Sequence, residues 1–120
     1  PGKRVGVITI SLGTLTPAHL VAAGAPIDTP VIGTEGGKTF TKSITGGSHT
    51  LDVNASRLDI VAAGHELIQR HPEIGALVLE CTNMGLFSRH LNHSLGVPVF
   101  DILNLLIWFQ VRLRPRRFLP

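Results

Sequence analysis

The sequence predicts a three-layer α/β domain: a parallel β-sheet with helices on both of its faces. Short apolar runs, typical of buried strands, alternate along the chain with segments of helical periodicity. Strands covered on both faces are apolar throughout, whereas strands with one solvated face alternate apolar and polar residues. The 120 residues suffice for one domain with its own core, without support from disulfides or metals.

The first strand and helix are marked by composition and by local start and stop signals. A β-branched run over residues 4–10 predicts a buried strand, and a turn over residues 11–15 follows it. Thr16 is a candidate N-cap, and Pro17 occupies the first helical position, where a missing N–H group costs nothing. The helix is expected to stop at Gly24, because glycine readily adopts the left-handed conformation that ends helices.

The middle of the chain combines a short strand, a long polar segment and the clearest helix. Residues 30–33 predict the strand, and residues 52–70 predict the helix, whose apolar side chains recur on one face. Residues 35–50 are rich in Gly, Thr, Ser and Lys and show no clear periodicity. Because such a long loop is uncommon in a compact domain, we expect it to be functional or to contain a short helix around residues 39–44.

Two further strand–helix pairs complete the predicted order. Residues 76–80 form an apolar strand that Cys81 follows at once, and residues 84–95 are expected to be helical. Residues 98–101 predict a last strand, and residues 102–113 predict a helix that is apolar nearly all round. Such a helix is either deeply buried or covered by another domain.

The net charge of +3 comes from the end of the chain rather than from its body. Four arginines lie within the last nine residues, namely Arg112, Arg114, Arg116 and Arg117. The remaining residues are close to neutral, whereas a nucleic-acid binder should show a basic face within its fold. We therefore expect an α/β domain over residues 1–109, a solvated Pro/Arg-rich tail over residues 110–120, and no nucleic-acid partner.

The apolar stretch and the cysteine content bear on the cellular location. Residues 97–109 are interrupted by Pro98, Asp101 and Asn104, and they fall short of the roughly 18 unbroken apolar residues of a membrane span. No membrane partner is therefore expected. A single cysteine, Cys81, excludes an internal disulfide, and a free thiol is consistent with a reducing, cytoplasmic location.

Polar side chains follow three of the predicted strands, at the edge where parallel sheets bind ligands. They are residues 11–16, the run Cys81, Thr82 and Asn83, and Asp101. A thiol between a strand and a helix start faces the positive end of the helix, which favours the thiolate. The amides of Thr82 and Asn83 could hold a carboxylate. The alternative is a buried structural cysteine, since free cysteines are among the most buried residues.

Several sharper motifs are missing from the sequence. A thiol phosphatase loop needs an arginine six positions after the cysteine, where Phe87 stands. No Cys-x-x-Cys pair, phosphate loop or dinucleotide fingerprint is present. His90 and His93 share a helix face, but no third ligand stands at a useful spacing. We therefore expect neither a metal ion nor a cofactor.

With these segments in view, the sequence resembles the aspartate/glutamate racemases, a family of cofactor-independent amino-acid racemases. The matching stretches are GVITISLGTLTPAHL from Gly6, IGTEGGKTF from Ile32, LDVNASRLDIVAAGHELIQRHPEIGALVLECTNM from Leu51 and GVPVFDILNLLIW from Gly96. The most specific part is ALVLECTNM followed by GVPVFDI. Two segments differ from the family pattern: Gly85-Leu86-Phe87 stands where a Pro-Pro-Tyr-like run is common, and VRLRPRRFLP has no counterpart.

The resemblance implies an isomerase made of two α/β domains related by a pseudo-two-fold axis, with one cysteine from each at the cleft between them. One cysteine removes the α-proton and the other reprotonates the opposite face. The chain then resembles the carboxyl-terminal half, with Cys81 as one of the two acid/base thiols. Thr82 and Asn83 would belong to the substrate-binding turn, and Ser11 and Thr14 would lie near the same cleft around a small carboxylate substrate.

Inversion at a carbon needs one group to remove the proton and another to deliver it on the opposite face. Only one cysteine is present in the chain, so three hypotheses stay open. In the first, the domain acts together with a missing amino-terminal half. In the second, two copies form a homodimer that rebuilds a two-cysteine site. In the third, the chain is a truncated, non-catalytic domain that binds a small carboxylate. Under the first hypothesis the isolated chain shows weak or no racemisation.

Overall fold

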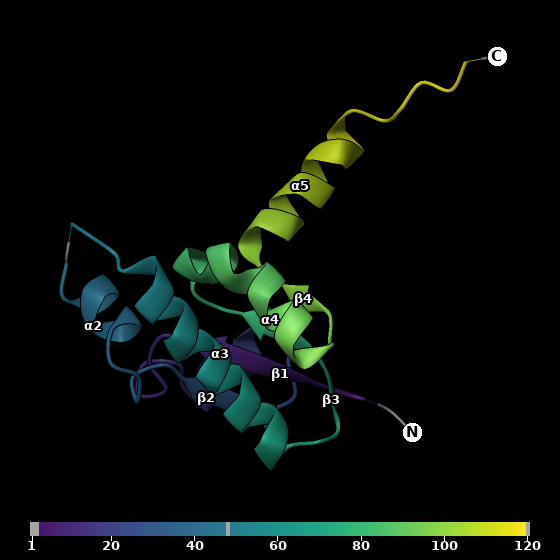
Figure 1. Ribbon diagram of the computed structural model, residues 1–120. Helices are drawn as coiled ribbons and strands as arrows, with labels where there is room; N and C mark the ends of the chain where they lie inside the picture. Colours follow the sequence, from purple (N-terminus) through teal and green to yellow (C-terminus); the bar gives the residue numbers. More distant parts are fainter. Residues whose placement is uncertain (1–2, 48, 120) are drawn as a thin grey trace.

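A parallel sheet organises the chain, as the computed structural model in Figure 1 shows for residues 3–47 and 49–119. Residues 1, 2, 48 and 120, which fall within the expected domain and tail, lie outside the described residues. The strands of this sheet are β1 (Arg4–Thr9), β2 (Val31–Gly33), β3 (Ile74–Leu79) and β4 (Val99–Phe100). Their order is β2-β1-β3-β4 and every pairing is parallel, which confirms the predicted α/β fold class.

The central strand β1 pairs with β2 on one side and with β3 on the other. Val7 lies opposite Val31 of β2 and opposite Val78 of β3. The short strand β4 extends the sheet at the far edge of β3, where Leu77 lies opposite Val99. Because all strands point the same way, their carboxyl ends meet at one edge of the sheet.

The helices follow the predicted order along the chain. They are α1 (Pro17–Ala22), α2 (Phe40–Thr45), α3 (Val53–Arg70), the 3₁₀ helix η1 (Thr82–Phe87), α4 (Ser88–Leu95) and α5 (Ile102–Leu113). The short helix expected within the polar segment is therefore present as α2. The segment expected to be one helix over residues 84–95 begins instead as η1. A 3₁₀ helix aligns side chains three residues apart, and Met84 and Phe87 are both buried on its inner face.

The core lies between one face of the sheet and the helices α2, α3, η1 and α4. Ile8 and Leu77 of the sheet are fully buried, as are Ile60 of α3 and Leu91 of α4. The rings of Phe40 and Phe87 meet edge to face, with centroids 6.1 Å apart. Two short elements, α2 and η1, are thereby fixed to the same core.

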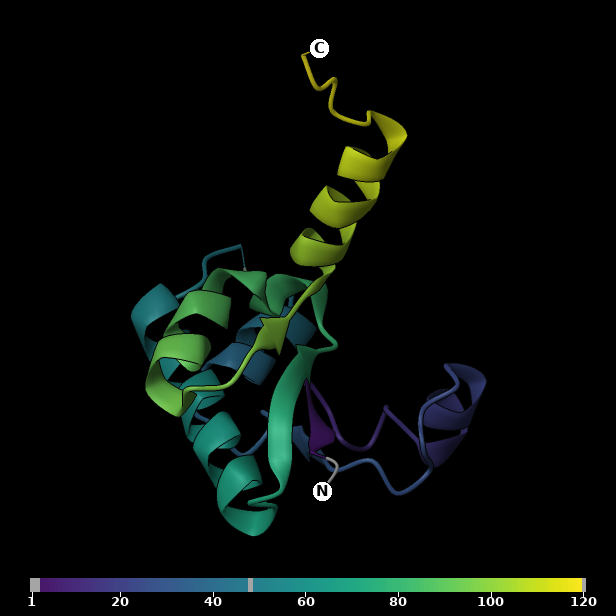
Figure 2. The same ribbon diagram turned by 90° about the vertical axis from the view of Figure 1, so that its right-hand side faces the viewer.

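The two faces of the sheet are covered unequally. Figure 2 shows α3 and α4 against one face, whereas α1 and α5 project away from the body. On the other face Val5 is 45% exposed and Phe100 is 54% exposed. The large apolar side chains of α5 are each more than half exposed, from Leu103 to Leu113. We expected the apolar helix α5 to be either deeply buried or covered by another domain. These exposures exclude its burial within the described part of the chain.

The long helix α3 anchors the polar segment through the carboxylate of Asp59. Its oxygens accept hydrogen bonds from the backbone N–H groups of Lys38 (3.1 Å), Thr39 (2.7 Å) and Phe40 (2.8 Å). Burial opposes the charged form, but these three hydrogen bonds and the Lys38 charge hold the pKa of Asp59 below its ordinary value of 3.8. The carboxylate therefore fixes the start of α2 against α3.

We predict that Asp59→Asn lowers the free energy of unfolding by about 1–3 kcal/mol at pH 7, because an amide cannot accept all three hydrogen bonds. Urea denaturation measures the change. The matched control is Glu66→Gln, which removes from the same helix an exposed carboxylate that forms an ion pair with Arg70. We expect Glu66→Gln to lower the free energy of unfolding by less than about 1 kcal/mol.

Comparing the wild type with Asp59→Asn at different pH values tests the pH dependence of this contribution to stability. The pKa of Asp59 is lower in the folded than in the unfolded chain, so its contribution is complete above 3.8 and is lost as the pH falls through the folded pKa. The wild type and Asp59→Asn should therefore converge in acid. Equal stability of the two proteins at pH 7 would contradict the anchoring role.

Candidate functional site

Cys81 lies at the carboxyl edge of the sheet, two residues after the end of β3 and directly before the first residue of η1. It is the N-cap residue of η1, and its carbonyl oxygen accepts a hydrogen bond from the Met84 N–H at 3.0 Å. The thiol is free and half-buried, partly packed against the core. Its Sγ lies 3.9 Å from the side-chain amide nitrogen of Asn83, a long and weak contact. Cys81 thus stands, only partly buried, at the junction that the sequence indicates.

Hydrogen bonds fix the ends of β1 and β3 beside each other. The Glu80 N–H donates to the carbonyl oxygen of Ile8 at 3.0 Å. The hydroxyl of the buried Thr9 donates to the Glu80 carboxylate at 2.9 Å. The residue after Glu80 is Cys81, and the turn after β1 begins two residues beyond Thr9. The two polar segments singled out from the sequence therefore leave the sheet side by side.

The turn after β1 contains both Ser11 and Thr14. Ser11 is half-buried and Thr14 is exposed, and the Thr14 hydroxyl donates to the Ser11 carbonyl oxygen at 3.1 Å. No hydrogen bond joins either residue to residues 81–83 within the part of the chain that the structure describes. The turn and the thiol thus share an edge of the sheet, but they are not in direct polar contact.

A second set of polar residues holds this turn in place. The Glu35 carboxylate accepts the Leu12 N–H with both oxygens, at 3.0 and 2.8 Å. The hydroxyls of Thr34 and Thr41 lie 2.8 Å apart, and Thr41 donates to the Ile10 carbonyl oxygen at 3.0 Å. These polar contacts to the turn were not predicted from the sequence. The feature that could have indicated them is the position of Thr34 and Glu35 directly after the apolar residues of β2.

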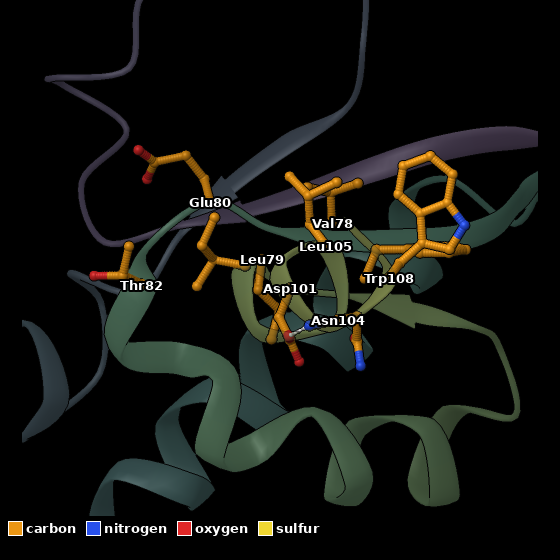
Figure 3. Close-up of a pocket in the computed structure, with 10 residues that line it drawn as sticks. Val78, Leu79, Glu80, Thr82, Asp101, Asn104, Leu105 and Trp108 are labelled. Carbon is orange, nitrogen blue, oxygen red and sulfur yellow. Dashed lines mark hydrogen bonds between the residues drawn. The ribbon is translucent and has the colours of Figure 1, made fainter. Parts of the chain in front are cut away.

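A cleft of about 640 Å³ opens beside the thiol segment, between the uncovered sheet face and α5. It is lined by Val78, Leu79, Glu80, Thr82, Phe100, Asp101, Ile102, Asn104, Leu105 and Trp108. Figure 3 shows Glu80 and Thr82 at one end and Trp108 at the other. Thr82 is the one residue among them that the racemase resemblance implies for the site, and Asp101 is the other polar residue expected at this edge. Cys81 adjoins the lining without belonging to it.

Asp101, which follows β4, has a structural role at this cleft. Its carboxylate accepts the Asn104 N–H at 2.8 Å as the N-cap of α5, and it also accepts the Ser88 hydroxyl. Figure 3 shows the first of these contacts. Among the described residues, the cleft is lined by two carboxylates, Asp101 and Glu80, and by no lysine or arginine. A bound carboxylate would therefore depend on hydroxyl and amide donors rather than on cationic side chains.

Two structural findings concern metals and membranes. Across residues 3–47 and 49–119 no three His, Cys, Asp or Glu side chains come together in a way that could hold a metal ion. Within those same residues, no helix has both the length and the apolar character that crossing a bilayer requires.

Comparison with known proteins gives one partial similarity. The chain is 34% identical over 53 residues to a dimethylsulfoniopropionate lyase from Durusdinium sp. clade D. The match covers 44% of this chain and 18% of that protein, so the chain spans less than a fifth of the curated relative it matches. No family model matches the chain, and no solved structure matches it either.

We predict that iodoacetamide labels Cys81 in the folded chain at pH 7 without denaturant, at a rate within about tenfold of that of glutathione, because a half-buried thiol is partly open to solvent. Mass spectrometry of the intact chain follows the labelling, and Cys81→Ser provides the unlabelled control. A thiol that is labelled only after denaturation would identify Cys81 as a structural core residue.

Proposed function

We propose that this chain is a domain of a cofactor-independent enzyme that moves the α-proton of a small carboxylate, with Cys81 as an acid/base thiol. The observation that supports this most is the half-buried free thiol at the carboxyl edge of an all-parallel sheet. Ligands of open α/β sheets bind at that edge. The resemblance to aspartate/glutamate racemases agrees with this position and favours a racemase or epimerase acting on amino acids or their derivatives.

In this proposal the thiolate of Cys81 takes the proton from the carbon next to the substrate carboxylate. Negative charge then develops on that carbon and spreads into the carboxylate, which must be held by fixed donors. Thr82 and Asn83 are the candidates for this task, since both follow the thiol directly and are exposed. Ser11 and Thr14 would bind the substrate from the neighbouring strand end.

Racemisation also needs a second group on the opposite side of the substrate, and no second cysteine is present in the chain. We propose that another half-domain or a second copy of this chain supplies it. The open sheet face and α5 support this, because soluble proteins rarely leave such a large apolar surface exposed. A covering partner would also close the cleft beside Thr82 and exclude water from it.

A second candidate reaction is elimination, favoured by the similarity to a protein named for lyase activity on dimethylsulfoniopropionate. This substrate is a carboxylate with a sulfonium group on its β-carbon. A base takes the α-proton, the electron pair forms a carbon–carbon double bond, and the β-carbon–sulfur bond breaks. Acrylate and dimethyl sulfide leave, and the proton on the base returns to water. One thiol suffices for this reaction, and racemisation shares its first step.

The decisive experiment measures that shared step. The chain is incubated in deuterium oxide with aspartate, glutamate or dimethylsulfoniopropionate, and proton NMR follows loss of the α-proton signal. We predict exchange or elimination with at least one of the three, about tenfold or more above the Cys81→Ser variant. With the amino acids, exchange should exceed inversion in chiral chromatography, because the single thiol serves one face.

The other outcomes also decide between the hypotheses. Rapid Cys81-dependent racemisation by a chain shown to be monomeric would contradict the need for a partner. Exchange that is equal in the wild type and in Cys81→Ser would refute the catalytic proposal and favour a non-catalytic carboxylate-binding domain.

A further inference from the structure

A second concave surface lies between α3 and α4, on the side of the domain away from the α5 cleft. It is a groove of about 530 Å³ lined by Arg57, Leu58, Val61, Arg89, His90, His93 and Ser94. We call it the basic groove. The first three residues come from α3 and the rest from α4, which lie side by side in Figure 1.

The helices that form the basic groove are held close together. Gly64 of α3 faces α4 so tightly that a Cβ atom there would lie 2.8 Å from side-chain carbons of Leu91 and of Leu95. One turn beyond Val61, the His65 imidazole Nε2 lies 2.8 Å from the Ser94 hydroxyl. This hydrogen bond joins the two helices at one end of the groove. The walls are therefore rigid elements rather than loops.

Within residues 3–47 and 49–119, no carboxylate neutralises the arginines of the basic groove. Arg57, Arg89, His90 and His93 form no ion pair or side-chain hydrogen bond with any described residue. No carboxylate lines the groove in the part of the chain that the structure describes.

Two carboxylates of α3 and the carboxylate that caps α5 are engaged elsewhere. Asp59 accepts backbone hydrogen bonds at the start of α2. Glu66 pairs with Arg70, and Asp101 accepts hydrogen bonds from Ser88 and Asn104. Two guanidinium groups and two imidazole rings thus face one concave surface without a counterion.

We propose that the basic groove binds a phosphate group, carried by a small organic molecule. Guanidinium groups donate two parallel hydrogen bonds to phosphate oxygens, and the imidazole rings of His90 and His93 add further donors. The volume exceeds what one phosphate fills, and Leu58 and Val61 offer apolar contact for an attached organic part. This site is separate from Cys81 and does not depend on the proposed catalysis.

The test titrates the chain with inorganic phosphate and with phenyl phosphate, by calorimetry and by NMR of the histidine rings at constant ionic strength. We expect saturable binding of both ligands, with phenyl phosphate the tighter because its ring meets Leu58 and Val61. The double variant Arg57→Gln/Arg89→Gln should weaken binding by about tenfold or more. The variant Cys81→Ser should bind as the wild type does.

The matched control is Arg70→Gln, which removes a positive charge from α3 outside the groove. Affinity for phenyl phosphate should stay within about twofold of the wild type, since exposed charges at a distance are screened by salt. Equal weakening by Arg70→Gln and by either Arg57→Gln or Arg89→Gln alone would show unspecific charge attraction and overturn the proposal. Linear, non-saturating titrations would overturn it as well. Thermal unfolding of each variant verifies that it is folded.

Discussion

The parallel pairing of β1 with β3 is the constraint on which the rest of the site depends. It sets the carboxyl ends of the two strands beside each other, and the Thr9–Glu80 hydrogen bond fixes that arrangement. The half-buried thiol of Cys81 and the turn that contains Ser11 leave the sheet at this edge as a consequence. An antiparallel pairing of the same strands would put the two segments at opposite ends of the sheet.

Unequal cover of the sheet gives the domain two different sides. On one side α3 and α4 bury a continuous core, and their outer surfaces form the basic groove. On the other side the sheet and α5 present apolar surface to solvent. An isolated helix of twelve residues is marginal in water, so a surface that covered α5 would stabilise it. Glu80 and Thr82, on either side of Cys81, line the cleft on this open side, so the partner that we propose would lie next to the thiol.

Sequence reasoning succeeded where the signal was local. Apolar runs located the strands, Pro17 and Gly24 marked the ends of the first helical segment, and the thiol was found at the expected junction. Hydrogen bonds between distant parts of the chain could not be predicted in this way, because Asp59 and Glu35 accept from backbone groups about twenty residues away. The open face was also unpredictable, since apolar residues in a strand look alike whether a helix of the same chain or a partner covers them.

We propose that small carboxylates bind at the shared edge of β1 and β3. A nitrogen–proton correlation NMR titration of the chain with aspartate and with succinate measures this binding residue by residue. Binding at that edge should produce saturable shifts of the backbone amides of residues 11–14 and 81–83, and smaller shifts of amides elsewhere in the domain. Amides at that edge that stay unmoved, while signals from other surfaces respond, would contradict it.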